Sequence, residues 1–247
     1  MPRYFIEVSY KGAVYSGFQV QKNSNTIQAE VERALEIFFK QKFTLTGSSR
    51  TDTGVHALQN FFHFDVRVSL SHQENNNEYH LNSILPKDIV IKKIFEVPEN
   101  MHCRFDAISR EYKYFIYQYK NPFLKDIAYY FPYKLDFDKL NKAATLIMHQ
   151  NDFTSFSKKN TQVKNFICEI MKSEWTIENG TLVYNVKANR FLRGMVKGLV
   201  GTMLRVGREI ISLEEFEKIF ESRDCTIADF SVAPHALFLI SINYNGF

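Results

Sequence analysis

Residues 167–187, ICEIMKSEWTIENGTLVYNVK, contain two strand-like segments separated by the dipeptide Asn179-Gly180. Asn-Gly between two such segments is a strong signal for a two-residue hairpin turn, because both central residues of that turn need a positive φ. The stretch therefore predicts two antiparallel strands, over 167–177 and 182–187. Connections of this kind favour an α+β fold with mainly antiparallel sheets.

The regions on both sides of this hairpin also mix strands with helices. Alternating apolar residues predict strands over 4–10, 43–46, 61–68, 89–95, 104–119 and 236–244. Helical spacing and capping residues predict helices that begin near Asn25, His80, Asp136, Arg190 and Ser212. The helix from Arg190 is expected to run to Val206 and to end near Gly207.

The change of pattern near residues 98–106 is the best candidate for a domain boundary. We expect two α+β halves, residues 1–103 and residues 104–247, without a sequence repeat between them. The polar stretch SHQENNNE at 71–78 is expected to be a surface loop.

Composition excludes several classes of protein. Apolar residues make up 45% and charged residues 23% of the chain, as in ordinary globular proteins and unlike disordered or fibrous ones. The three cysteines lack the spacing of a zinc or redox motif and fit a reducing compartment, where all three are expected to be buried. No apolar run is long enough for a membrane span, and the N-terminus does not resemble a signal peptide, so we expect a cytoplasmic protein.

The stretch GSSRTDTGVHA at 47–57 combines small residues with Arg50, Asp52 and His56. Small residues allow tight turns and close approach of a ligand, and a neighbouring arginine favours the ionised carboxylate that a nucleophile needs. Two other interpretations remain open. Asp52 fits a capped turn with Arg50 in a surface ion pair, or a metal site with His56, although the stretch offers no third or fourth ligand.

The segment from Lys187 to Arg208 contains six basic residues and no acidic one: Lys187, Arg190, Arg193, Lys197, Arg205 and Arg208. On a broadly apolar helix, such an unbalanced stripe suits contact with phosphates, although a solvated basic face is the common alternative. The net charge of +4 is only weak evidence for a polyanionic partner. Gly194, Gly198 and Gly201 indicate close approach, either of another element or of RNA.

Six stretches together resemble one known family, in order and in spacing. GSSRTDTGVHA resembles the signature G-x-x-R-T-D-x-G-V-H-A of the tRNA pseudouridine synthase A family. The other matching stretches are the first-strand segment 10–19, REYKYFIY at 110–117, NDFTSF at 151–156 and FLRGMVKGLVGTMLRVG at 191–207. The closing segment ALFLISINY at 236–244 is similar to the family's last strand. Ordered matches over nearly the whole chain are far more specific than one motif.

The resemblance implies an enzyme that isomerises uridine to pseudouridine in the anticodon stem-loop of tRNA, at positions 38 to 40. It implies no metal and no organic cofactor, and a homodimer in which one tRNA touches both subunits. The implied fold has two α+β halves, each with an antiparallel sheet, that meet at a basic cleft.

The family's functional residues map onto this sequence by motif. Asp52 matches the essential aspartate, a nucleophile toward either the ribose or the uracil ring. Arg50 matches the arginine that holds the target nucleotide out of its stack, and Tyr112 the tyrosine that packs against the flipped base. Leu237, in the closing strand, is also expected at the substrate. We expect RNA contacts from Lys187, Arg190, Arg193 and Arg205.

One position departs from the family pattern, because Lys197 stands where the family has an arginine that pairs with the aspartate. Lysine keeps the charge but loses the planar fork that holds a carboxylate through two bonds. We hypothesise that Lys197 still pairs with Asp52. The alternative functions are a non-catalytic RNA-binding relative and a metal-dependent hydrolase centred on Asp52 and His56.

Overall fold

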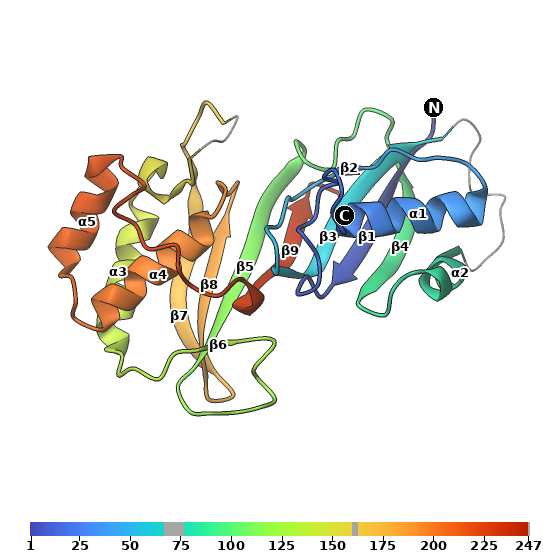
Figure 1. The fold of residues 1–247 in the computed structure, drawn as a ribbon. Coiled ribbons are helices and arrows are strands. Elements are labelled where there is room, and N and C mark those ends of the chain that lie inside the picture. The colour runs from blue at the N-terminus through green and yellow to red at the C-terminus, as the bar shows by residue number, and fades with distance from the viewer. Residues whose placement is uncertain (67–76, 160–162, 247) are drawn as a thin grey trace. The chain divides into compact units, whose positions relative to one another are not determined.

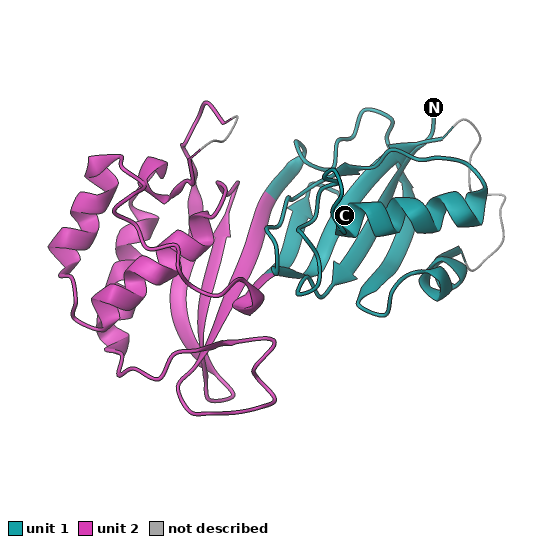
Figure 2. Cartoon of the chain, viewed as in Figure 1, with its two compact units in different colours: residues 1–108, 239–247 teal, residues 109–238 magenta. Residues whose placement is uncertain are grey.

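The computed structural model describes residues 1–66, 77–159 and 163–246. The chain forms two compact units, coloured separately in Figure 2. Unit 1 contains Met1–Ile108 and Leu239–Phe247, and unit 2 contains Ser109–Phe238. The division therefore falls five residues after the expected boundary at 103/104, and the closing segment returns to unit 1.

Unit 1 is built on an antiparallel sheet. Strand β1 (Arg3–Tyr10) pairs with β3 (His56–Asp65) on one side and with β4 (Ile89–Val97) on the other. The short β2 (Thr46–Gly47) pairs with β3. Strand β9 (Leu237–Tyr244), which belongs to unit 1 from Leu239 onward, lies beside β3 in the sheet order.

Two helices pack on this sheet, and Figure 1 shows α1 lying across the strands. Helix α1 (Ile27–Phe39) buries Ile27, Val31, Ala34 and Leu35, and α2 (Asn77–Ile84) packs against β4. The expected cap at Asn25 was wrong by one residue, since Thr26 accepts the hydrogen bond from the Ala29 amide. A cap must lie directly before the first helical turn, and Thr26 holds the required extended backbone.

The main strands of unit 2 pair antiparallel, in the order β5-β8-β7. These strands are β5 (Ala107–Tyr117), β7 (Ile170–Glu178) and β8 (Thr181–Ala188). The short β6 (Tyr129–Tyr130) pairs in parallel with β5. Helices α3 (Phe137–Met148), α4 (Met195–Gly207) and α5 (Leu213–Ser222) pack together, with α3 also against β7.

Local sequence signals in unit 2 are confirmed in detail. Asn179 and Gly180 both have positive φ, 49° and 73°, as the hairpin turn requires. Asp136 caps α3 by accepting from the Lys139 amide, and Ser212 and Glu215 form the reciprocal capping box of α5. The parallel β6 was not predicted, because a two-residue strand has no periodicity to detect.

The expected helix from Arg190 to Val206 was wrong at its start. Helix α4 begins at Met195, after Gly194 at φ 75°. Lys187 lies on β8, and Arg190 and Arg193 lie in the turn before the helix. Only Lys197 and Arg205 of the expected basic stripe are on α4, so the stripe does not follow one helix face.

Other predicted boundaries differ by a few residues. Strand β3 begins at His56, inside the stretch expected to be a loop, and most of the polar stretch 71–78 lies outside the described residues. The fold class is nevertheless confirmed as α+β with a largely antiparallel mixed sheet. Among the described helices, none combines the length and apolar character needed to cross a membrane.

Candidate active site

The segment between β2 and β3 presents Asp52 in an alternating pattern. Ser49 and Thr51 are buried, at 8% and 7% exposure, whereas Arg50 is exposed and Asp52 is half-buried. Successive side chains of an extended chain point to opposite sides. The alternation of burial over 49–52 therefore fits an extended segment with Arg50 and Asp52 on its accessible side.

The turn after Asp52 is closed by its own backbone. The Val55 amide donates to the Asp52 carbonyl oxygen at 3.1 Å, and Gly54 adopts φ 81° within this turn. A positive φ of this kind strains a residue with a Cβ, so glycine suits the position. The carboxylate is thus carried on a tight turn rather than on a regular element.

The first-strand motif at 10–19 packs directly on this loop, so the structure brings together two stretches that are about 40 residues apart in the sequence. The Phe18 amide donates to the Thr51 carbonyl oxygen at 3.1 Å. Gly17, at φ 98°, lies so close that a Cβ there would be 3.1 Å from the same oxygen. A Cβ on Gly12 would lie 2.0 Å from the Val55 carbonyl oxygen. The two glycines allow backbone to touch backbone.

His56 takes part in this packing. It is buried, and its Nδ1 accepts a hydrogen bond from the Gly12 amide at 3.1 Å. Among the described residues, Asp52 and His56 do not belong to a group of three possible metal-binding side chains. The metal-site interpretation of this loop thus gains no third ligand from the described fold.

Three candidate substrate residues lie in unit 2, namely Tyr112, Leu237 and Lys197. Tyr112 is on β5 at 8% exposure, and its ring meets Phe191 edge to face with centroids 5.0 Å apart. It shares the buried face of the strand with Tyr114, which is fully buried and donates to the Ala233 carbonyl oxygen. Leu237 is buried at the first residue of β9. Burial of Tyr112 suits a core residue as well as a base-stacking one.

Lys197 lies in the first turn of α4 and is only 9% exposed. Lysine is rarely this buried, because removing an ammonium group from water is unfavourable unless other groups compensate. The position is therefore unusual for a lysine whose only role is solubility. Asp52 and Arg50 belong to unit 1, whereas Lys197, Tyr112 and Leu237 belong to unit 2.

The candidate RNA-binding residues differ in accessibility. Arg193 is exposed, and Lys187, Arg190 and Arg205 are half-buried. Arg208, just after α4, places its guanidinium 3.9 Å from the centroid of the Tyr133 ring. Only part of the basic segment thus presents its charge to solvent.

Two glycines of α4 are explained by packing. A Cβ on Gly201 would lie 2.2 Å from the Asp229 carbonyl oxygen, and one on Gly198 would lie 2.7 Å from the Phe230 ring. Thr202 accepts a hydrogen bond from the Asp229 amide at 3.0 Å, which holds the same segment against the helix. Close approach of another element, one of the two open interpretations, accounts for these two positions.

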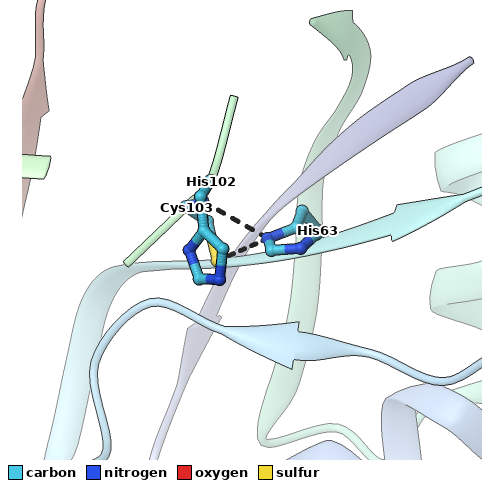
Figure 3. Close-up of side chains that lie close together, drawn as sticks. All are labelled: His63, His102 and Cys103. Atoms are coloured by element: carbon cyan, nitrogen blue, oxygen red, sulfur yellow. Dashed lines mark hydrogen bonds between the residues drawn. The ribbon is translucent and has the colours of Figure 1, made fainter. Parts of the chain in front are cut away.

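One group of three possible metal-binding side chains occurs among the described residues, away from the catalytic loop. It consists of His63, His102 and Cys103, and one ligand atom of each lies within 4.8 Å of the others (Figure 3). The sequence did not indicate it, because His63 is about 40 residues from the other two. Cys103 and Cys168 are buried as expected, whereas Cys225 is only half-buried.

Hydrogen bonds account for this cluster. The Cys103 thiol donates to the Thr46 carbonyl oxygen and lies 3.1 Å from His63 Nδ1. His102 Nδ1 accepts from the Arg104 amide at 3.1 Å, which places the proton of the neutral ring on Nε2. The lone pair of Nδ1 is used in this hydrogen bond and is therefore removed as a metal ligand. Burial, with help from His102 and Arg3, lowers the pKa of His63 to about 4, so its ring is neutral at pH 7. The cluster therefore links β3 to the segment before β5.

Comparisons with known proteins agree with the motifs. A family model described as tRNA pseudouridine synthase matches residues 6–106 and 143–245. A "tRNA pseudouridine synthase A" of Bacteroides fragilis is 43% identical over 243 residues, 98% of this chain and 96% of the relative. Proteins of the same description from Azobacteroides pseudotrichonymphae and Pseudothermotoga lettingae are 41% and 35% identical, each over 99% of this chain and 97% and 100% of their own lengths. The chain belongs to the tRNA pseudouridine synthase family.

Proposed function

We propose that this protein isomerises uridine to pseudouridine in tRNA, with Asp52 as the catalytic group. Membership of the family over nearly the whole chain carries the reaction class. The turn that presents Asp52 beside an exposed Arg50 supports the choice of residue. The enzyme is an isomerase, and its tRNA substrate places it in the cytoplasm.

The reaction rearranges bonds within one nucleotide. The bond between uracil N1 and ribose C1′ breaks, and a bond between uracil C5 and C1′ forms. The hydrogen on C5 leaves as a proton, and N1 gains one, so that no oxidant or other co-reactant is required. Asp52 acts as the nucleophile, toward the ribose or the uracil ring, and returns unchanged.

The neighbouring residues have complementary roles in this proposal. Arg50 helps to hold the target nucleotide out of its stack, and the extrusion of that nucleotide costs a few kcal/mol. Tyr112 stacks on the flipped base, a contact that contributes about 1–3 kcal/mol in comparable cases. Leu237 adds an apolar contact, and Lys197 pairs with the Asp52 carboxylate.

The target uridines are those of the anticodon stem-loop, at positions 38 to 40. Lys187, Arg190, Arg193 and Arg205 hold the phosphate backbone. Mapping pseudouridines in tRNA from cells with and without this protein tests the positions. The proposal includes a homodimer, which predicts a particle of twice the 29.0 kDa chain mass in light scattering.

Replacement of Asp52 tests the central assignment. Asp52→Asn should lower turnover by about 10⁴-fold or more, because loss of a nucleophile removes the chemical step. Tritium release from tRNA labelled at uracil C5 measures that step, and a filter-binding assay should show that tRNA still binds. Asp138→Asn, at an exposed position of α3, is the matched control and should keep full activity.

The same assay separates the two leading functions. A non-catalytic RNA-binding relative would bind tRNA and release no tritium in the wild type. Full turnover by Asp52→Asn would instead leave the family intact and reject Asp52 as the catalytic group.

A further inference from the structure

Two buried polar side chains outside the signature loop hold the residues on both sides of Arg50. Asn60 lies on β3 and is fully buried, and Tyr10 is the last residue of β1 and is 4% exposed. Asn60 bonds to the main chain of Ser49 and Tyr10 to the side chain of Thr51, the two buried residues on either side of Arg50. All these residues belong to unit 1.

Asn60 uses its whole hydrogen-bonding capacity at this place. Its Oδ1 accepts from the Ser49 amide at 3.3 Å and from the Phe61 amide at 2.9 Å. Its Nδ2 donates to the Ser49 carbonyl oxygen at 2.9 Å and to Tyr10 Oη at 3.1 Å. A primary amide has two acceptor and two donor sites, so reversing its orientation would put donors against donors. The side chain therefore fixes both main-chain groups of Ser49.

Tyr10 extends this connection to Thr51. Its Oη shares a 2.7 Å hydrogen bond with Thr51 Oγ1, and its ring packs on Phe18 with centroids 5.8 Å apart. The path therefore runs from Ser49 through Asn60 and Tyr10 to Thr51. Arg50 lies between its two ends, and Asp52 follows directly.

The hydrogen bonds of Asn60 and Tyr10 are required to orient the residues around Arg50 rather than to close the turn after Asp52. The bonds of the Val55 and Phe18 amides hold the backbone of 51–55. They reach neither Ser49, whose two main-chain groups Asn60 holds, nor the Thr51 side chain, which Tyr10 holds. Placement errors of about 1 Å at a reacting group lower rates by about 100-fold. A buried network with every group paired is a rigid support for such a group.

We propose that Asn60 and Tyr10 are positioning residues of the reaction, which orient Asp52 and Arg50 by fixing Ser49 and Thr51. The inference rests on Asp52 being the catalytic group, as proposed above. Neither residue contacts the substrate in this role. Their loss should therefore lower the rate of the chemical step and leave the affinity for tRNA unchanged.

The test compares Asn60→Ala with a matched asparagine elsewhere in unit 1. Asn82 on α2 holds Ile91 in the same manner, accepting from its amide and donating to its carbonyl oxygen, each at 2.8 Å. Asn82→Ala therefore removes a similar clamp far from the loop in sequence. Tyr10→Phe, which removes one oxygen, is compared in the same way with Tyr4→Phe, whose hydroxyl group bonds to Glu96.

Single-turnover tritium release, the Kd for tRNA and the melting temperature are measured for each variant. Asn60→Ala should lower the single-turnover rate by about 100-fold and Tyr10→Phe by about 10-fold, with Kd unchanged. Asn82→Ala and Tyr4→Phe should lower the melting temperature to a similar degree and keep the wild-type rate in the folded protein.

The inference is overturned if the Asn60 and Asn82 variants lose rate alike, or if the Asn60 effect is on Kd alone. If Asn60→Ala does not fold, Tyr10→Phe provides the test, because wild-type turnover in Tyr10→Phe also overturns the inference. Asp52→Asn is assayed beside them. Turnover retained in Asp52→Asn rejects Asp52 as the catalytic group, whereas turnover lost there and kept in Asn60→Ala rejects only the positioning role.

Discussion

The loop around Asp52 and helix α4 carry the two charges that the proposed chemistry pairs, and they are held by different forces. The loop is fixed by hydrogen bonds to its backbone, from Phe18, Val55 and Asn60. Helix α4 is almost entirely buried and is fixed by packing, with two glycines at van der Waals limits. A network of hydrogen bonds fixes the direction in which a side chain points, whereas a packed helix fixes where its side chains are placed. A carboxylate on a turn depends on such a network more than a lysine on a helix does.

Among the tests of this comparison, the largest effect is expected from removal of the α4 charge. Lys197→Ala should lower turnover by about 100-fold, because the nucleophile loses the cation that orients it. Lys197→Arg should retain most of the rate, since the charge remains. Single-turnover tritium release measures both variants, and wild-type turnover in the alanine variant would reject the pairing with Asp52.

A substitution at Gly201 tests whether packing holds helix α4 in place. Gly201→Ala should lower the free energy of unfolding by about 1–3 kcal/mol, because its Cβ would lie 2.2 Å from the Asp229 carbonyl oxygen. The higher helix propensity of alanine returns about 1 kcal/mol at most. Urea denaturation measures the change. Gly198→Ala is the control with a smaller expected loss, since it meets the Phe230 ring, which can move.

A buried polar side chain of unit 1, His63, predicts that stability depends on pH. The pKa of His63 is about 4 in the folded protein, below its ordinary value of 6.5, chiefly because of burial. The unfolded chain therefore binds the extra proton first as the pH falls, and folding loses stability between pH 6.5 and pH 4. The melting temperature should drop from pH 7 to pH 5, and it should drop less in His63→Gln. The exposed His149→Gln should behave as the wild type.

The smallest effect is expected at the solvent-exposed end of the basic segment. Arg193→Ala should weaken tRNA binding only a few-fold and reduce the slope of log Kd against log salt by about one, because one phosphate contact is lost. Filter binding over a range of salt concentrations measures the slope. Arg33→Ala, at a position of α1 paired with Glu30, should leave it unchanged. Equal slopes for Arg193→Ala and the wild type would remove Arg193 from the RNA interface.

Elements with a strong local signal could be predicted from the sequence. The Asn179-Gly180 turn, the Asp136 cap and the capping box of Ser212 depend on backbone conformations that neighbouring residues dictate. The start of α4 was wrong because the apolar pattern continues backward through Phe191 and Leu192, whereas Gly194 at positive φ ends the preceding turn. Periodicity detects burial, and burial alone does not distinguish a turn from a helix.

Asn60 shows most clearly what the sequence concealed. It precedes a run of phenylalanines and fell just outside the predicted strand 61–68, so its polar side chain drew no functional interpretation. Its importance depends on where Ser49 and Tyr10 lie, and these are 11 and 50 residues away. The His63 and Cys103 contact was hidden for the same reason.

The sequence by itself determined the family, the reaction class and the identity of Asp52 as the candidate nucleophile, because ordered motifs record which side chains the chemistry needs. It also determined local turns and caps, which neighbouring residues control. Only the tertiary structure decided which residues hold the Asp52 loop, since a buried donor must find its acceptor through the folding of distant segments onto one another. The same is true of Gly198 and Gly201 on α4, which are explained by the ring of Phe230 and the backbone of Asp229 packed against them.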